Sequence, residues 1–200
     1  MLEILRQRRS VRDFSDQPIP EQTLEALREA VLRAPTSRNR QPWQFVFVTE
    51  KATIEALAIS KAHGTRFLET AQLALVICAD PEVSDVWIED CSIAAITAQY
   101  VAESLGLKSC WGQLRLRPHD ESCSASDFVR KLLEIPHHLE VPVIIGFGYP
   151  QQPTTGHARE ELAWKKLHGE KFSRGLSAKA PKHLAPDCNT TGRQPNRVDG

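Results

Sequence analysis

The sequence lacks the features that define several large protein classes. Its five cysteines are an odd number and none forms a CxxC pair, so neither a disulfide framework nor a zinc site is expected. Its longest apolar runs, such as LALVICA at 73–79, are far shorter than the roughly 20 residues of a membrane-spanning helix. The first residues, MLEILRQRRS, lack the pattern of a secretory signal. We therefore expect a cytoplasmic protein with no metal and no membrane partner.

Familiar catalytic motifs are also missing. The sequence contains no HExxH, no GxSxG and no GxxxxGKS, which gives no support to a metalloprotease, a serine hydrolase or a P-loop enzyme. The GFG at 146–148 is too short to be a dinucleotide-binding fingerprint.

Net charge is zero, because 25 Lys and Arg balance 25 Asp and Glu. Bulk binding to nucleic acid is therefore not expected. The charges are nevertheless segregated: residues 1–40 carry eight basic and six acidic side chains, residues 41–150 eight and fourteen, and residues 151–200 nine and five. A local anion site is therefore expected near one or both ends of the chain.

A chain of 200 residues with 41% hydrophobic positions suits one globular domain with a real core. Apolar periodicity and turn residues predict an irregular alternation of helices and strands, hence an α/β or α+β fold. The expected helices are 2–8, 20–35, 52–61, 85–105, 124–133 and 158–168, and the expected strands are 44–49, 73–79, 108–114 and 141–149. We expect one domain over 1–173 and a disordered polar tail over 174–200.

The segment 85–105 predicts a helix that is apolar on most sides. Ile88, Cys91, Ala95, Ala98 and Ala102 recur at spacings of three and four, with further apolar residues around the cylinder. Such a helix is buried, either in the core or in a subunit interface, and its small residues would allow another helix to approach closely.

Three segments could carry chemistry. In RRSVR, residues 8–12, Arg8, Arg9 and Arg12 with Ser10 form either a solvated basic surface or a clamp for phosphate or carboxylate. In PTSRNRQPW, residues 35–43, short hydroxyl and amide groups could bind a heteroaromatic ring or a polyol chain, or simply cap a helix. In GFGYPQQP, residues 146–153, glycines permit close approach of backbone, and Arg159 follows downstream.

Taken in this order, the segments resemble the nitroreductase family of FMN-dependent oxidoreductases. The resemblance rests on RRSVRDF, APTSRNRQPWQF, EDCSIAAITAQYVAESLGLKSCW and IIGFGYP, and it covers about residues 2–173. It implies an α+β fold with a mixed, mostly antiparallel sheet flanked by helices, in an intertwined homodimer with one FMN in each of two interface sites.

The resemblance also implies roles for individual residues. Arg8 and Arg159 would hold the phosphate, with Arg9 and Ser10 nearby, and Arg12 would lie by the N1 and O2 edge of the flavin. Pro35, Thr36, Ser37 and Asn39 would contact the flavin bound mainly by the other subunit. Gly112 and Gln113 occupy the region that faces flavin N5.

The implied activity is transfer of hydride from NADH or NADPH through flavin N5 to a nitroaromatic, quinone or similar electron-poor acceptor, in a ping-pong cycle. No side chain has to act as a nucleophile, and Arg12 would give electrostatic support. Two alternatives stay open: another flavin reaction on the same fold, such as dehalogenation, dehydrogenation or flavin fragmentation, and a non-enzymatic anion-binding module.

Overall fold

A computed structural model describes residues 1–172 and 174 of the chain. These residues fall into two compact units, one formed by residues 1–158 and the other beginning at Arg159. Of the predicted tail over 174–200, all but Arg174 lies outside the described residues.

The first unit is built on a four-stranded sheet with the order β1-β2-β4-β3, in which every neighbouring pair is antiparallel. The expected α+β architecture is therefore present, and the named strands form a purely antiparallel sheet rather than a mixed one. One isolated parallel bridge joins Ser10 to Ser109 at the β3 edge. The strands are β1 (Trp43–Val48), β2 (Leu73–Ala79), β3 (Lys108–Gln113) and β4 (Glu140–Gly148).

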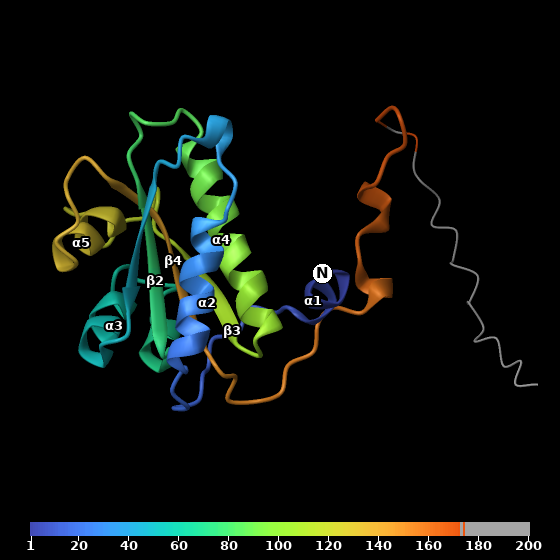
Figure 1. Cartoon of the computed structure of the whole chain (residues 1–200), viewed down its shortest axis with the longest axis horizontal. Coiled ribbons are helices and arrows are strands. Elements are labelled where there is room, and N and C mark those ends of the chain that lie inside the picture. The colour runs from blue at the N-terminus through green and yellow to red at the C-terminus, as the bar shows by residue number, and fades with distance from the viewer. Residues whose placement is uncertain (173, 175–200) are drawn as a thin grey trace, which may run out of the picture. The chain divides into compact units, whose positions relative to one another are not determined.

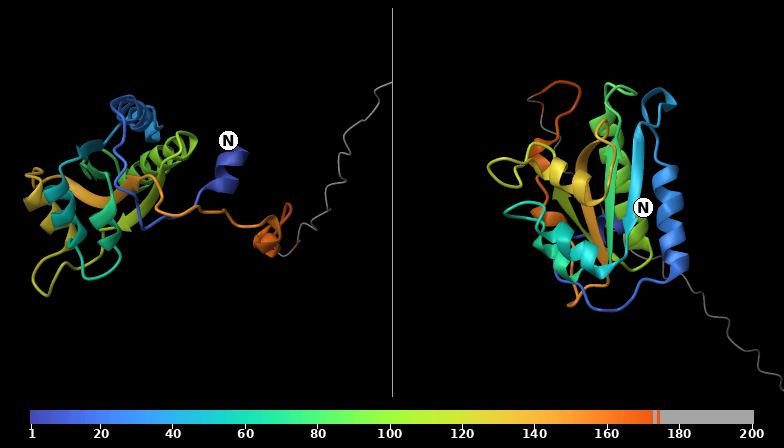
Figure 2. Two further views of the ribbon diagram at one scale, coloured as in Figure 1. Left: turned by 90° about the horizontal axis from the view of Figure 1, so that it is seen from below. Right: turned by 90° about the vertical axis from the view of Figure 1, so that its left-hand side faces the viewer.

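Two layers of helices cover the sheet (Figures 1 and 2). On one face α2 and α4 pack against each other and against the sheet, and α3 and α5 cover the other face. The helices of this unit are α1 (Leu2–Gln7), α2 (Glu21–Leu32), α3 (Lys51–Ala58), α4 (Trp87–Ser104) and α5 (Ala125–Leu132).

The central strands explain why the core lies where it does. All seven residues of β2 are buried, as are all residues of β4 after Glu140. A strand that is apolar on both sides must be covered on both faces, and the two helical layers provide this cover. The predicted strands agree with the observed ones within one or two residues.

Besides a single 3-10 turn at Ser37–Asn39, two stretches of the chain differ from the expectation. The segment before β2 contains a 3-10 helix, η2 (Arg66–Thr70), which the apolar pattern did not predict. The helix expected over 158–168 is wrong, since this stretch forms two 3-10 turns, η3 (Arg159–Glu161) and η4 (Trp164–Lys166). The Arg159 carbonyl accepts hydrogen bonds from the Leu162 amide and the Trp164 indole, and this arrangement replaces the α-helical bond.

Gly146 of β4 lets η2 pack directly on the sheet. A Cβ atom at this position would lie 2.8 Å from Phe67 Cε2 and 3.0 Å from Leu68 Cδ2, and both side chains are buried. We expect Gly146→Ala to lower the free energy of unfolding by about 1–3 kcal/mol, because the core must shift to admit a methyl group. Urea denaturation measures this loss, and Gln44→Ala, at an exposed site on β1, is the control. A Gly146→Ala protein as stable as the control would contradict this packing.

Candidate functional site

The arginine-rich segment is fixed against the free edge of β3. Ser10 bridges Ser109, and the Val11 amide donates a hydrogen bond of 3.1 Å to the Ser109 carbonyl. Further along, Phe14 packs on Gly148, where a Cβ atom would lie 2.9 Å from Phe14 Cβ. Val11 and Phe14 are buried and anchor the segment, whereas Arg8 and Arg9 are half-buried and Arg12 is exposed.

Four of the predicted residues line one cavity of about 260 Å³. They are Arg8, Arg9, Ser10 and Arg12, and His157 completes the lining. The Arg9 guanidinium and the His157 imidazole form a hydrogen bond. A second hollow, of about 460 Å³, shares Arg9, Ser10 and Arg12, and its other lining residues are Val11, Asp13, Gln152, Thr154 and Thr155.

Among the residues that the structure describes, Arg8 and Arg12 form no ion pair, although Asp13 lines the second hollow. Within the described part of the chain, no carboxylate oxygen lies within 4 Å of a nitrogen of Arg8 or Arg12. Burial raises the pKa of the Cys110 thiol, and the charge of Arg12 opposes this shift, as do Lys61 and Arg8 more weakly. Three cations therefore lie around one residue of β3, an arrangement that suits an anionic ligand.

The edge of β3 beyond Ser109 offers backbone groups. In an antiparallel pair, alternate residues direct their N–H and C=O groups to opposite sides of the strand. Because the Ser109 carbonyl bonds Val11 on the free side, Trp111 and Gln113 direct their backbone groups to the same side, whereas Gly112 faces β4. Trp111 and Gln113 therefore direct their backbone groups to the free edge of β3, beyond the point where the arginine-rich segment is bonded to Ser109.

Gly112 has a packing role. A Cβ atom on it would lie 2.9 Å from Ile144 Cγ2 and 3.3 Å from Thr65 Cγ2, so the chain that enters η2 packs directly over this glycine. The roles of Gly112 and Gln113 beside a flavin stay predictions.

Lys61, which the sequence did not indicate as a site residue, also contacts the β3 edge. It follows α3, and its ammonium donates a hydrogen bond of 2.8 Å to the Gln113 carbonyl. Nothing in the local sequence signals this contact, since the two residues are 52 positions apart and the lysine stands in an ordinary polar turn.

The polar loop that contains Pro35, Thr36, Ser37 and Asn39 is held by a buried aspartate. Asp90 is 1% exposed, and it accepts hydrogen bonds from the Ser37 amide at 2.9 Å and from the Ser84 hydroxyl at 3.0 Å. The Thr36 hydroxyl accepts from the Gln41 amide at 3.1 Å, and Arg38, Asn39 and Gln41 adopt positive φ angles of 48–54°. This loop is thus tied to the first turn of α4. The sequence indicated only that the loop is polar.

None of these loop residues lines either arginine cavity. Their predicted contact with a flavin held mainly by a second subunit stays a prediction. Arg159 belongs to the second unit, where its guanidinium lies over the Trp164 ring at 4.5 Å from the ring centroid. Its predicted convergence with Arg8 on one phosphate also stays a prediction.

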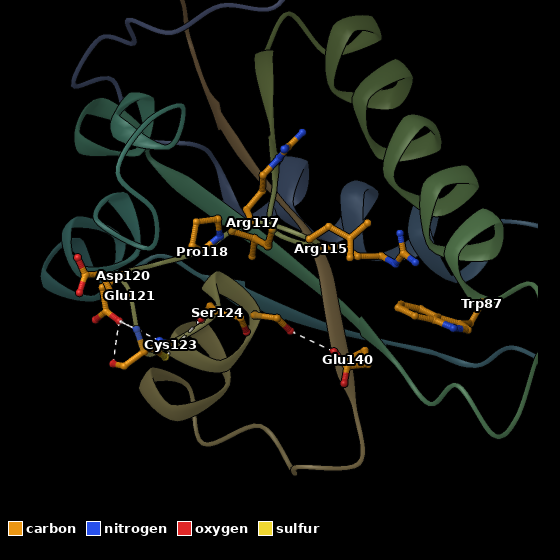
Figure 3. Close-up of a pocket in the computed structure, with 13 residues that line it drawn as sticks. Trp87, Arg115, Arg117, Pro118, Asp120, Glu121, Cys123, Ser124 and Glu140 are labelled. Carbon is orange, nitrogen blue, oxygen red and sulfur yellow. Dashed lines mark hydrogen bonds between the residues drawn. The ribbon is translucent and has the colours of Figure 1, made fainter.

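A larger cavity, of about 600 Å³, lies beside the loop that follows β3 (Figure 3). Its wall includes Trp87, Arg115, Arg117 and Glu140, together with the loop residues 118 and 120–124. Figure 3 shows Arg115 directed toward Trp87, whereas Arg117 leaves the loop in another direction, away from Asp120 and Glu121. The cavity contains none of the predicted site residues.

Two buried cysteines, Cys78 and Cys91, are unsuited to act as nucleophiles. Burial raises the pKa of Cys78 to about 11 and that of Cys91 to about 12, which keeps both thiols protonated at neutral pH. Among the residues that the structure describes, no cluster of His, Cys, Asp and Glu could hold a metal ion, and no helix is long and apolar enough to cross a membrane.

Comparisons with known proteins agree with this architecture. The model of the nitroreductase family matches residues 5–149. An FMN-dependent nitroreductase structure from Clostridium difficile is 38% identical, with a TM-score of 0.84 over 86% of this chain and 100% of the other. A protein of Archaeoglobus fulgidus, whose name assigns it provisionally to the NADH dehydrogenases or NAD(P)H nitroreductases, is 32% identical over 86% of this chain and 98% of its own.

These matches cover the sheet, the helical layers and the arginine-rich segment. The chain therefore belongs to the nitroreductase family, and it is an oxidoreductase of that family.

We expect Asp90→Ala to destabilise the fold by about 1–3 kcal/mol, because it leaves the Ser37 amide and the Ser84 hydroxyl without their acceptor. The free energy of unfolding from urea titration measures the loss, and Glu89→Ala, at the exposed neighbouring position, is the control. Equal stability of the two variants would show that Asp90 does not hold the loop.

Proposed function

We propose that this protein is an FMN-dependent oxidoreductase that takes reducing equivalents from NADH or NADPH and passes them to nitroaromatic compounds, quinones or similar electron-poor acceptors. The observation that carries the proposal is the cavity lined by Arg8, Arg9, Ser10 and Arg12 beside the free edge of β3. The printed names of relatives support it, including the FMN-dependent nitroreductase above and an FMN reductase [NAD(P)H] of Bacillus subtilis that is 27% identical.

The residues present fit FMN. Guanidinium groups match phosphate oxygens in bidentate geometry, and Arg8 and Arg9 stand in the same cavity as the Ser10 hydroxyl. The backbone N–H and C=O groups of Trp111 and the backbone N–H of Gln113 are suited to the donors and acceptors on the edge of a heteroaromatic ring. Bound there, FMN would supply the hydride-transfer chemistry that no side chain of this protein provides.

The chain itself would bind and orient the cofactor and stabilise charge. Arg12 lies in the arginine cavity, close enough to β3 to act on the Cys110 thiol. A cation at this edge favours negative charge on a ring bound alongside it. Lys61, at the far end of the same edge, would add to this field.

We also propose that the enzyme works as a homodimer packed through α4. The outer face of this helix carries Ile93, which is 38% exposed, and the half-buried Ile96 and Tyr100. A second copy packed here would cover apolar surface that water now contacts. Asp90 ties the 35–39 loop to the same helix, so that a dimer formed through α4 would carry the loop toward the partner.

Loss of one phosphate-binding arginine tests the cofactor site. We expect Arg8→Ala to weaken FMN binding by about 2 kcal/mol, roughly thirtyfold in Kd, because a charge-assisted hydrogen bond is lost. Titration of the apoprotein with FMN, followed by quenching of flavin fluorescence, measures the change. Arg33→Ala, on the surface of α2 where Arg33 pairs with Glu29, is the control and should bind like the wild type. Equal affinity in both variants would refute the phosphate role of Arg8.

The dimer proposal has its own test. Light scattering after size exclusion should give twice the chain mass for the wild type and a shift toward the chain mass for Ile93→Glu, since a buried unpaired charge opposes association. Leu32→Glu, at a 61% exposed position of α2, should remain dimeric. A monomeric wild type, or Ile93→Glu that stays fully dimeric, would contradict an interface at this face.

A further inference from the structure

The chain that follows β4 runs along the arginine-rich segment, and residues 149–157 are called the covering segment below. The Ser15 amide donates a hydrogen bond of 2.9 Å to the Tyr149 carbonyl. The Gln151 amide donates one of 3.1 Å to the Asp13 carbonyl. Beyond this pairing, the covering segment contributes lining residues to both arginine cavities, namely Gln152, Thr154 and Thr155 to the larger one and His157 to the smaller one.

Gly156 lets the covering segment lie directly on the end of α1. A Cβ atom at this position would overlap the Arg6 carbonyl oxygen and lie 2.7 Å from the Arg6 carbonyl carbon. Both are backbone atoms, which cannot turn aside as the end of a flexible side chain can. A side chain at position 156 would therefore move the covering segment away from α1, and His157 with it.

His157 holds the side chain of Arg9 by a hydrogen bond between a guanidinium nitrogen and the imidazole Nε2 atom. A guanidinium has N–H donors and no acceptor, so Nε2 must be the acceptor. The imidazole in this pair is therefore neutral, with its proton on Nδ1. His157 adds no positive charge to the cavity in this form, and its effect is to fix the direction of one guanidinium.

Arg9 is the arginine for which a fixed direction matters most. It lines both arginine cavities, whereas Arg8 lines only the smaller one. An arginine side chain has many rotamers, and bidentate binding of a phosphate requires one of them. A guanidinium that is already held in the cavity loses less conformational freedom when the anion binds, so the anion binds more tightly.

We propose that His157 is a positioning residue of the cofactor-phosphate site and that it acts through Arg9. By accepting one N–H of Arg9, His157 keeps the guanidinium in the cavity, where its other N–H groups can bind phosphate oxygens. Gly156 makes this contact possible, because it allows the covering segment to approach α1. The inference rests on the proposed function, since the phosphate is that of FMN.

Titration of the apoprotein with FMN, and with riboflavin, which has the same ring and ribityl chain but no phosphate, tests this role. We expect His157→Ala to weaken FMN binding about three- to tenfold and to leave riboflavin binding unchanged, because the lost hydrogen bond serves only the phosphate. His157→Gln, whose side-chain carbonyl can accept from Arg9, should bind FMN like the wild type. His138→Ala, at an exposed position that lines neither arginine cavity, is the matched control.

A double-mutant cycle tests whether His157 acts through Arg9. Arg9→Ala should weaken FMN binding by itself. Adding His157→Ala to it should change the Kd by less than about twofold, because the imidazole then has no guanidinium to hold. Gly156→Ala leaves every charged side chain in place, and it should weaken FMN binding about as much as His157→Ala.

Unchanged FMN affinity in His157→Ala would overturn the proposal, and so would equal losses of FMN and riboflavin binding, which would indicate a general change of the site. A full further loss on adding His157→Ala to Arg9→Ala would also contradict it, because His157 would then act without Arg9. Wild-type affinity in Gly156→Ala would refute the role of the close contact with α1. All these results leave the proposed function intact, whereas a wild type that binds no FMN would refute the proposed function itself.

Discussion

The hydrogen bond from the Val11 amide to the Ser109 carbonyl fixes the geometry on which the site depends. It places the arginine-rich segment against one end of an edge strand and leaves the backbone of Trp111 uncovered beyond it, whereas the Gln113 carbonyl is bonded by Lys61. An uncovered strand edge is normally a liability, because its backbone groups can pair with other chains. Here the edge is flanked by cations at both ends, so that it suits a polar, anionic ligand. The fold itself contributes the donors and acceptors, and the side chains contribute the charge.

Much of the fold follows from local pattern. The run LALVICA is apolar without alternation, which predicts a strand covered on both faces, and β2 is buried throughout. The spacing of apolar residues from Ile88 to Ala102 likewise predicts α4. The segregation of charge predicted that any anion site would lie near one or both ends of the chain, and the arginines of RRSVR line one cavity near its start. The helix predicted over 158–168 does not form, because the Arg159 carbonyl accepts a hydrogen bond from the Trp164 indole instead of from a helical amide.

What the sequence could not predict depends on contacts between distant residues. Lys61 meets Gln113 only because the sheet brings the end of β3 beneath the turn after α3. Asp90 was visible only as one polar residue on an apolar helix, yet it is buried and ties the 35–39 loop to α4 through the Ser37 amide, 53 positions away. Such side chains have no periodicity of their own, so that no local signal distinguishes them from surface charges.

The central claim is that the β3 edge and its cations form a flavin site. The most direct measurement is a titration of the apoprotein with FMN, followed by the visible absorption and fluorescence of the flavin. We expect saturable binding of one FMN per chain, with affinity that falls as salt screens the arginines. A protein that takes up no FMN at any salt concentration would contradict it.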